Sequence, residues 1–296
     1  MTPWTDRAGR FSPLKAATFA GLLLPALWLG YSAWRGFPGA AGGVSLLGPR
    51  PITEAIHQTG DWTIRLLLMS LAVTPLRRIL QWPKLITVRR MIGLGALSYA
   101  LGHFCLYVLD QKLDLWRVGS EIALRIYLTI GFAALIGLIA LGVTSTDAAI
   151  RRLGRNWNRL HAIVYAIGVL AAIHFFMQTK ADVYEATLIA GLFILMMLYR
   201  LAHHHGLPLT SWLALSGLAV AAGLATAAAE LAWYGLATGI PPLRVLEANL
   251  HFAYQVRPAW WVLAAGIGVA LAAAARYATA RDNAPRGRRQ PARVAA

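Results

Sequence analysis

Residues 160–178 read LHAIVYAIGVLAAIHFFMQ, an apolar run of membrane-spanning length that carries His161 near its start and His174 near its end. A second run, residues 91–109, reads MIGLGALSYALGHFCLYVL and holds His103 deep inside it. A transmembrane helix needs about 20 mostly apolar residues, and ionisable side chains are costly in hydrocarbon. Histidines at these positions therefore indicate a functional site, and two helices with histidines at facing depths are suited to holding a haem between them.

The composition of the whole chain agrees with these two runs. Of 296 residues, 58% are hydrophobic and 14% are charged, and the mean hydropathy is +0.55. This is too much apolar surface for a soluble domain of this length, so we predict an all-α polytopic membrane protein. Eight spans are expected, at residues 14–34, 60–76, 91–109, 124–143, 160–178, 183–201, 209–234 and 258–275.

The net charge of +16 indicates a topology rather than a nucleic-acid partner, because the basic residues gather at the ends of the spans. With the N-terminus in the cytoplasm, nineteen of the twenty-eight Lys and Arg residues fall on the cytoplasmic side. We therefore expect a multi-pass membrane protein with both termini in the cytoplasm. The apolar stretch from Ala16 to Trp34 is longer than a usual signal-peptide core, which favours a retained anchor.

The pattern divides the chain into four regions. Residues 1–49 comprise a cytoplasmic segment, the first span and part of an outer loop, residues 35–59, that is rich in Gly and Pro and expected to be irregular. Residues 50–201 form a haem-binding core. Residues 202–275 add two spans, and residues 276–296 form a basic tail that is expected to be disordered.

One cytoplasmic connection has a more regular pattern than the others. Residues 144–147 read TSTD and offer a helix N-cap, and Arg151, Arg152, Arg155 and Arg159 follow at helical spacing. This pattern predicts an interfacial helix facing anionic lipid headgroups.

Cys105 is the only cysteine, which excludes an intramolecular disulfide and the C-x-x-C-H signature of covalently attached haem. Any haem would therefore be of the b type. We find no hydrolase, metalloprotease, phosphate-loop or dinucleotide-binding signature and predict no catalytic residue. Electrons would enter from a cytoplasmic flavoprotein or from membrane quinol, which makes FMN and quinone further cofactor candidates, and substrate reduction would occur on a separate protein.

The depths of the histidines follow from the helical rise of about 1.5 Å per residue, which places His103 roughly 18 Å and His174 roughly 21 Å from the cytoplasmic side. One haem iron is expected to take both as axial ligands. His161 lies about 20 Å below His174 by the same rise, at the cytoplasmic end of its span. For a second, inner haem we predict His161 as ligand and Arg89, fourteen residues before His103, as a propionate partner.

Two considerations oppose this assignment. A step of thirteen residues places His161 and His174 roughly 140° apart around an ideal helix, so the pair requires a distorted turn, for which Gly168 is a candidate. In addition, a lone intramembrane histidine is able to serve only as a hydrogen-bonding partner between helices.

Several motifs between about residues 50 and 200, taken together, resemble one family. They are Arg50-Pro51-Ile52, Thr59-Gly60-Asp61-Trp62, Thr74-Pro75-Leu76-Arg77-Arg78, Arg89-Arg90-Met91-Ile92-Gly93-Leu94, His103, residues 141–147, Arg151-Arg152-Leu153-Gly154-Arg155, Trp157, Arg159-Leu160-His161 and Lys180-Ala181-Asp182. The family is that of the ferric-reductase-like membrane haem proteins, and within it the haem-binding membrane subunits of the bacterial periplasmic methionine sulfoxide reductase system.

The resemblance implies that His103, His161 and His174 bind haem iron. It also implies that the protein passes electrons across the inner membrane to a periplasmic molybdopterin-dependent partner that reduces protein methionine sulfoxide. In the wider family the third and fifth core helices each carry two histidines, whereas here the third carries one, with Arg89 near the other position. The two additional C-terminal spans depart from the usual six-helix pattern.

The sequence thus predicts a six-helix ferric-reductase-like core with one or two b-type haems, plus two further helices. Its expected function is electron transfer from a cytoplasmic flavin reductase or quinol to the periplasmic reductase. One alternative is a membrane metalloreductase or quinol-linked cytochrome with another acceptor. An alternative of a different class is a haem-free transporter or assembly scaffold, whose histidines relay protons or pack against neighbours.

Overall fold

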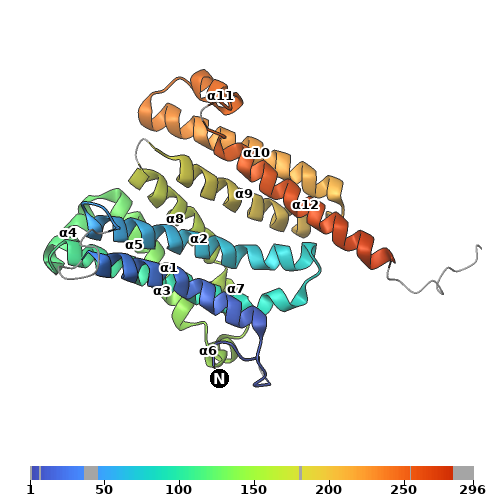
Figure 1. Cartoon of the computed structure of the whole chain (residues 1–296), viewed down its shortest axis with the longest axis horizontal. Helices are drawn as coiled ribbons and strands as arrows, with labels where there is room; N and C mark the ends of the chain where they lie inside the picture. Colours follow the sequence, from blue (N-terminus) through green and yellow to red (C-terminus); the bar gives the residue numbers. More distant parts are fainter. Residues whose placement is uncertain (1, 7, 37–45, 180–181, 254, 283–296) are drawn as a thin grey trace, which may run out of the picture.

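The computed structural model describes all residues except 1, 7, 37–45, 180–181, 254 and 283–296 (Figure 1). The described residues are overwhelmingly helical, and their only strand-like pairing is an isolated bridge between Thr5 and Phe11. The eight long helices are α1 (Pro13–Arg35), α2 (Pro51–Ile79), α3 (Ile86–Asp110), α5 (Ile126–Val143), α8 (Val164–Thr179), α9 (Tyr184–His204), α10 (Trp212–Trp233) and α12 (Pro258–Asp282). The short ones are η1 (Pro83–Leu85), α4 (Leu115–Leu124), α6 (Asp147–Leu153), α7 (Arg155–His161), η2 (Tyr234–Thr238) and α11 (Pro242–Leu250).

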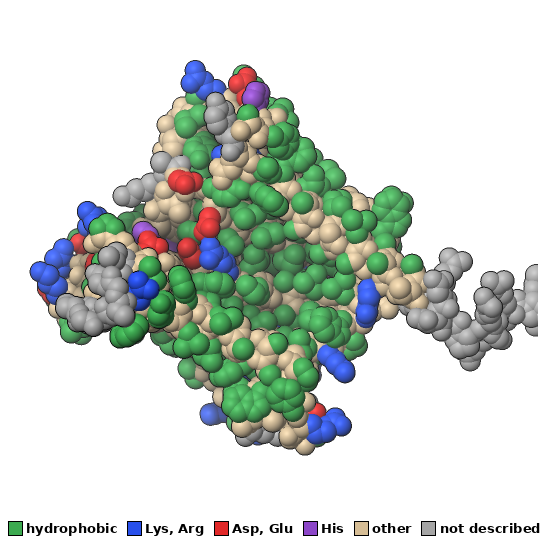
Figure 2. All heavy atoms as spheres, in the orientation of Figure 1, with side chains coloured by type: hydrophobic (Ala, Val, Ile, Leu, Met, Phe, Trp, Pro, Cys, Tyr) green, Lys and Arg blue, Asp and Glu red, His purple; other side chains and the backbone are tan. Residues whose placement is uncertain are grey.

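Seven segments within the described residues are long and apolar enough to cross a membrane, and they correspond to seven of the eight expected spans. The eighth long helix, α2, carries Glu54, Asp61 and Arg65 in its N-terminal half and packs against α3, α8 and α9. Apolar side chains cover most of the face shown in Figure 2, while Lys and Arg lie mainly toward its ends. The chain is therefore a multi-pass membrane protein with the predicted helical fold.

Three groups of buried apolar side chains hold the described part of the bundle together. The first lies among α2, α3, α5 and α8, around residues such as Leu71, Ala96 and Leu138. The second lies among α9, α10 and α12, around residues such as Leu195 and Val262. Figure 1 shows the same division, with α10 and α12 packed side by side along α9 and away from α3 and α5. A third, smaller group joins the histidine-bearing α8 to the C-terminal layer, because the ring centroid of Phe176 on α8 lies 5.0 Å from that of Trp233 on α10.

Several boundaries differ from the sequence prediction. Helix α2 begins at Pro51, so the last part of the loop expected at 35–59 is helical, whereas residues 37–45 lie outside the described residues. The tail expected to be disordered from residue 276 continues α12 to Asp282, and the rest of it lies outside the described residues. The amphipathic helices α4 and α11 were not predicted, because their mixed polar and apolar composition does not resemble a span.

The basic connection that contains Arg151, Arg152, Arg155 and Arg159 is helical, as predicted. Thr146 caps α6 through its side chain, which accepts a hydrogen bond from the backbone N–H of Ala149 at 3.1 Å. The helix then breaks at Gly154, whose φ of +52° is unfavourable for other residues, and α7 starts directly after it. The arginines of this region therefore lie on two short helices rather than one.

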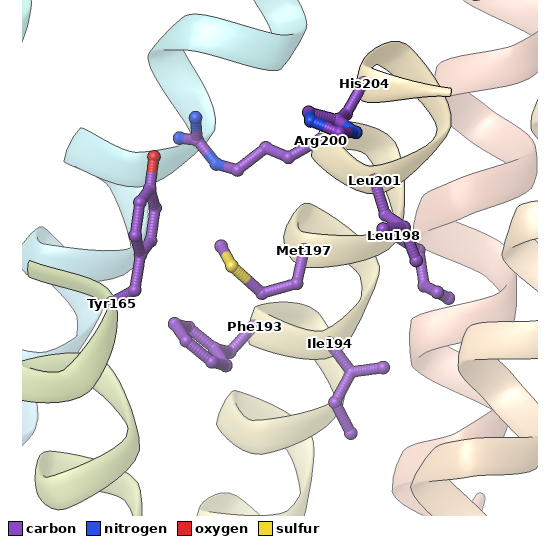
Figure 3. Close-up of a pocket in the computed structure, with 8 residues that line it drawn as sticks. All are labelled: Tyr165, Phe193, Ile194, Met197, Leu198, Arg200, Leu201 and His204. Atoms are coloured by element: carbon purple, nitrogen blue, oxygen red, sulfur yellow. The ribbon is translucent and has the colours of Figure 1, made fainter. Parts of the chain in front are cut away.

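A proline inside α2 leaves a backbone carbonyl without its usual donor. Pro75 has no N–H to give to the carbonyl of Leu71, which is buried in the bundle. Arg200 of α9 fills the gap, because its Nη2 donates to that carbonyl at 2.5 Å. Figure 3 shows the Arg200 side chain reaching from α9 past the hydroxyl of Tyr165, whose ring centroid lies 5.2 Å from the guanidinium carbon. These residues line the polar end of a groove of about 480 Å³ whose other walls are largely apolar.

Arg200→Met is expected to destabilise the protein by roughly 1–3 kcal/mol, because it leaves the Leu71 carbonyl without a donor. In a Pro75→Ala background the restored N–H of residue 75 donates to the Leu71 carbonyl, so Arg200→Met should lower the unfolding free energy by a clearly smaller amount. Unfolding free energies of the four proteins in detergent test this double-mutant cycle. Equal costs in both backgrounds would show that Arg200 does not act through the proline gap.

Candidate functional site

His103 and His174 come together at the end of the first helix cluster that is formed by the N-terminal halves of α2 and α5 and the C-terminal halves of α3 and α8. This end is expected to face away from the cytoplasm and is called the outer end below. His103 lies on α3 and His174 on α8, and their ring centroids are 6.4 Å apart with the ring planes at 87°. An iron atom between two imidazoles, bonded to each at about 2 Å, separates the ring centroids by roughly 6 Å. The two residues predicted from their matching depths therefore lie at a spacing that fits bis-histidine ligation.

Each of the two rings is held through one nitrogen. The Nδ1 of His103 lies 2.8 Å from the carbonyl oxygen of Ile56, and the Nδ1 of His174 lies 2.8 Å from that of Tyr127. A carbonyl oxygen only accepts hydrogen bonds, so in both residues Nδ1 carries the hydrogen and Nε2 keeps its lone pair. This is the tautomer that a metal-binding histidine uses when a backbone carbonyl orients it.

The helices that supply these carbonyls also supply space for the rings. Gly60 of α2 lies against His103, and Gly131 of α5 lies against His174. The hydroxyl of Thr59, which is buried, also approaches the Ile56 carbonyl, at 2.9 Å. The motif Thr59-Gly60 therefore belongs to the surroundings of His103. This role could not be predicted from the sequence, because the motif lies on a different helix from His103.

A charged cluster lies beside the His103 helix pair. The Arg65 Nη2 is 3.0 Å from both carboxylate oxygens of Glu185 on α9 and 4.0 Å from Asp61 Oδ2. The Arg65 guanidinium also stands 5.5 Å from the centroid of the Trp62 ring. These charges are partnered, which is how a membrane bundle accommodates them, and they explain why α2 is less apolar than the other long helices.

His161 has different surroundings from the other two histidines. It ends α7, and residues 162–163 separate it from α8, so the expected continuous helix from 160 to 178 is broken. The irregular turn between His161 and His174 therefore lies at residues 162–163 and not at Gly168. Gly168 instead lies within regular α8, where the ring of Phe193 occupies the space beside it.

At this inner position the structure places one imidazole. His161 stacks on Trp157, with ring centroids 3.8 Å apart, and its Nε2 lies 3.1 Å from Thr144 Oγ1. The Trp157 Nε1 donates to the Thr144 carbonyl at 2.9 Å. Arg89 lies near the start of α3, where its backbone carbonyl accepts a hydrogen bond from Ser70 Oγ at 3.4 Å. Within the described residues no group of three or more His, Cys, Asp or Glu side chains forms a metal site.

The fold and the site define a ferric-reductase-like transmembrane protein. The family model of the ferric reductase like transmembrane component matches residues 59–172, which run from α2 into α8 and include His103 and His161, whereas His174 lies two residues beyond the match. No solved structure is similar to this chain.

Named relatives narrow the class further. The "Protein-methionine-sulfoxide reductase heme-binding subunit MsrQ" of Xanthomonas campestris pv. campestris (strain 8004) is 41% identical over 187 residues, which cover 63% of this chain and 84% of that protein. The protein of the same description from Caulobacter vibrioides (strain ATCC 19089 / CIP 103742 / CB 15) is 39% identical over 178 residues, or 60% of this chain and 80% of that one. The chain belongs to the MsrQ family. More than a third of its length lies outside these alignments.

Proposed function

We propose that the protein is the b-type haem-binding membrane subunit of a protein-methionine-sulfoxide reductase system. The observation that carries the proposal is the pair formed by His103 and His174, from two separate helices, with both Nδ1 atoms bonded to backbone carbonyls and both Nε2 atoms left to bind a metal. The relatives that share the fold are named as heme-binding subunits of this reductase. A bound haem supplies one-electron redox chemistry.

The protein's own contribution is to position the ligands and to keep the site apolar. The low-dielectric bundle around α2, α3, α5 and α8 encloses the histidines and spans the membrane. We propose that electrons enter on the cytoplasmic side, from a flavin reductase or from quinol, and leave toward a periplasmic molybdopterin-dependent subunit. That partner would reduce methionine sulfoxide with two electrons and two protons, giving methionine and water.

The experiment uses the purified full-length chain in detergent. We expect a Soret band and reduced-state absorption bands of a b-type haem after reduction with dithionite. Mixing with the periplasmic catalytic subunit and a methionine sulfoxide peptide should reoxidise the protein, with two equivalents consumed per sulfoxide. Colourless protein would favour a scaffold or transporter, and reoxidation by ferric citrate but not by the catalytic subunit would favour a metalloreductase.

For a second, inner haem the residues proposed remain His161 and Arg89. The haem-to-chain ratio tests the inner haem separately. A ratio of two in the wild type that falls to one in His161→Ala would support the inner haem site. A ratio of one that His161→Ala leaves unchanged would assign His161 to the cluster with Thr144 and Trp157 instead.

A further inference from the structure

The surroundings of His103 and His174 repeat one another in detail. His103 lies 47 residues after Ile56, and the Ile56 carbonyl accepts a hydrogen bond from His103 Nδ1. His174 likewise lies 47 residues after Tyr127, and the Tyr127 carbonyl accepts a hydrogen bond from His174 Nδ1. Both distances are 2.8 Å. In each case the acceptor lies in the outer half of one helix, and the histidine lies in the outer half of the helix that follows it in the core.

A glycine stands one helical turn after each of these carbonyls. A Cβ on Gly60 would lie 3.1 Å from both Nδ1 and Cε1 of His103, and a Cβ on Gly131 would lie 2.8 Å from the same two atoms of His174. The same edge of each ring therefore lies against the backbone of the neighbouring helix. Neither position leaves ordinary van der Waals space for a side chain.

The helix packing follows the same pattern. Helix α2 packs on α3 and α5 packs on α8, while the cross contacts join α2 to α8 and α3 to α5. If α2 is exchanged with α5 and α3 with α8, the α2–α3 contact becomes the α5–α8 contact, and the α2–α8 contact becomes the α3–α5 contact. This is the pattern expected when two helix pairs of the same direction are related by an approximate two-fold axis along the membrane normal.

The likeness is confined to the outer end of the bundle. His161 precedes His174 by thirteen residues, and the residue at the corresponding place before His103 is Arg90, which pairs with Asp147 at 2.6 Å. The inner ends of the two helix pairs therefore differ, while the outer ends keep the same carbonyl, glycine and histidine. A repeat retained only around the two histidines points to a role in their chemistry.

We propose that Ile56 with Gly60, and Tyr127 with Gly131, form two equivalent brackets that each set the tautomer and orientation of one haem-ligating histidine. In each bracket the carbonyl fixes the hydrogen on Nδ1, and the glycine lets the ring approach closely enough to make that bond. A hydrogen-bonded Nδ1 makes the imidazole a stronger donor at Nε2 and stabilises oxidised iron. The proposal rests on the proposed function, since it assigns positioning residues to the same site.

The angle between the rings gives the brackets a spectroscopic signature. The ring planes stand at 87° to one another, and each plane is held by its own helix. Ferric haem with two perpendicular axial imidazoles gives a highly anisotropic low-spin electron paramagnetic resonance signal, whereas near-parallel imidazoles give a rhombic one. We therefore expect the oxidised wild-type protein to show the highly anisotropic signal.

The test compares Gly60→Ala, Gly131→Ala and a control, Gly217→Ala, in the full-length protein. An added Cβ at Gly217 of α10 meets no atom within 4 Å, so this variant should match the wild type. Gly131→Ala should retain haem roughly 10- to 100-fold more weakly. Any haem it keeps should have a more positive midpoint potential and a changed resonance signal. Gly60→Ala should show the same changes to a smaller degree, because its contact is less close.

Wild-type resonance signals and midpoint potentials in both bracket variants would overturn the proposal. If Gly131→Ala yields no folded protein, the wild-type spectrum decides, because a rhombic signal contradicts the bracket geometry. Failure of the brackets is distinguishable from failure of the haem assignment. In the first case His103→Ala and His174→Ala still lose haem while the glycine variants are normal, and in the second case the wild-type protein carries no haem.

Discussion

Purified His103→Ala and His174→Ala proteins are expected to lack the outer haem and to transfer no electrons to the periplasmic subunit. The ring centroids lie 6.4 Å apart with the planes at 87°, a spacing that suits one iron held by both imidazoles, so either substitution removes one of its two ligands. Removing one ligand leaves iron with a single protein bond in a site shaped for two. We expect haem content to fall at least about 10-fold, since even residues that only orient a metal ligand change affinity by about that factor.

The measurement is the ratio of Soret absorbance to protein in variants purified side by side, together with reoxidation by the catalytic subunit. His251→Ala is the matched control, because this exposed histidine lies far along the chain and bonds only a backbone carbonyl through Nδ1. The control should keep full haem and full activity. Normal haem content in either His103→Ala or His174→Ala would refute the assignment of that residue.

The spans could be predicted from the sequence because most of them are apolar runs of membrane length. Helix α2 was predicted too short, since the span expected from residue 60 left out the polar first turns of the helix, which contain Glu54, His57 and Gln58. Inside the predicted span, the charge of Arg65 is balanced by Asp61 and by Glu185 on a distant segment. No local pattern reveals a partner more than a hundred residues away. The short helices α4 and α11 escaped prediction for a related reason, since they depend on packing against the ends of the long helices.

The two facing histidines were also predictable, because helical rise alone gives their depths. Their brackets were not, since a backbone carbonyl leaves no trace in the sequence and glycines are common in membrane helices. The equal spacing from Gly60 to His103 and from Gly131 to His174 is the signal that sequence reasoning missed. The break between α7 and α8 was equally hidden, because residues 162–163 have the same apolar character as the helix that follows.

The C-terminal layer, which we propose to be an appended unit, depends on a buried ion pair. Glu230 of α10 is fully buried and pairs with Arg257, which precedes α12. Asn249 of α11 donates to the other Glu230 carboxylate oxygen at 2.9 Å, and the Trp260 Nε1 donates to the Asn249 carbonyl at 2.7 Å. This cluster joins α10, α11 and α12 at one end of the layer.

Arg257→Met is expected to lower the unfolding free energy of this layer by about 3–5 kcal/mol, because it leaves the buried carboxylate of Glu230 without its cation. Replacing both partners, as in Glu230→Leu with Arg257→Met, should restore most of that loss, since an apolar pair removes the uncompensated charge. Unfolding in detergent, followed by tryptophan fluorescence, measures both effects.

The haem absorbance provides an independent probe of the first helix cluster in the same samples. Because the ion pair joins α10 to the residue that precedes α12 and lies outside the first helix cluster, the fluorescence transition of Arg257→Met should shift to milder conditions while the haem absorbance is lost later. A stability equal to the wild type in Arg257→Met would show that the ion pair contributes nothing. A double variant as unstable as the single one would show that the charge left on Glu230 is not the cause. Simultaneous loss of both signals would mean that the C-terminal helices are an integral part of the haem-binding fold.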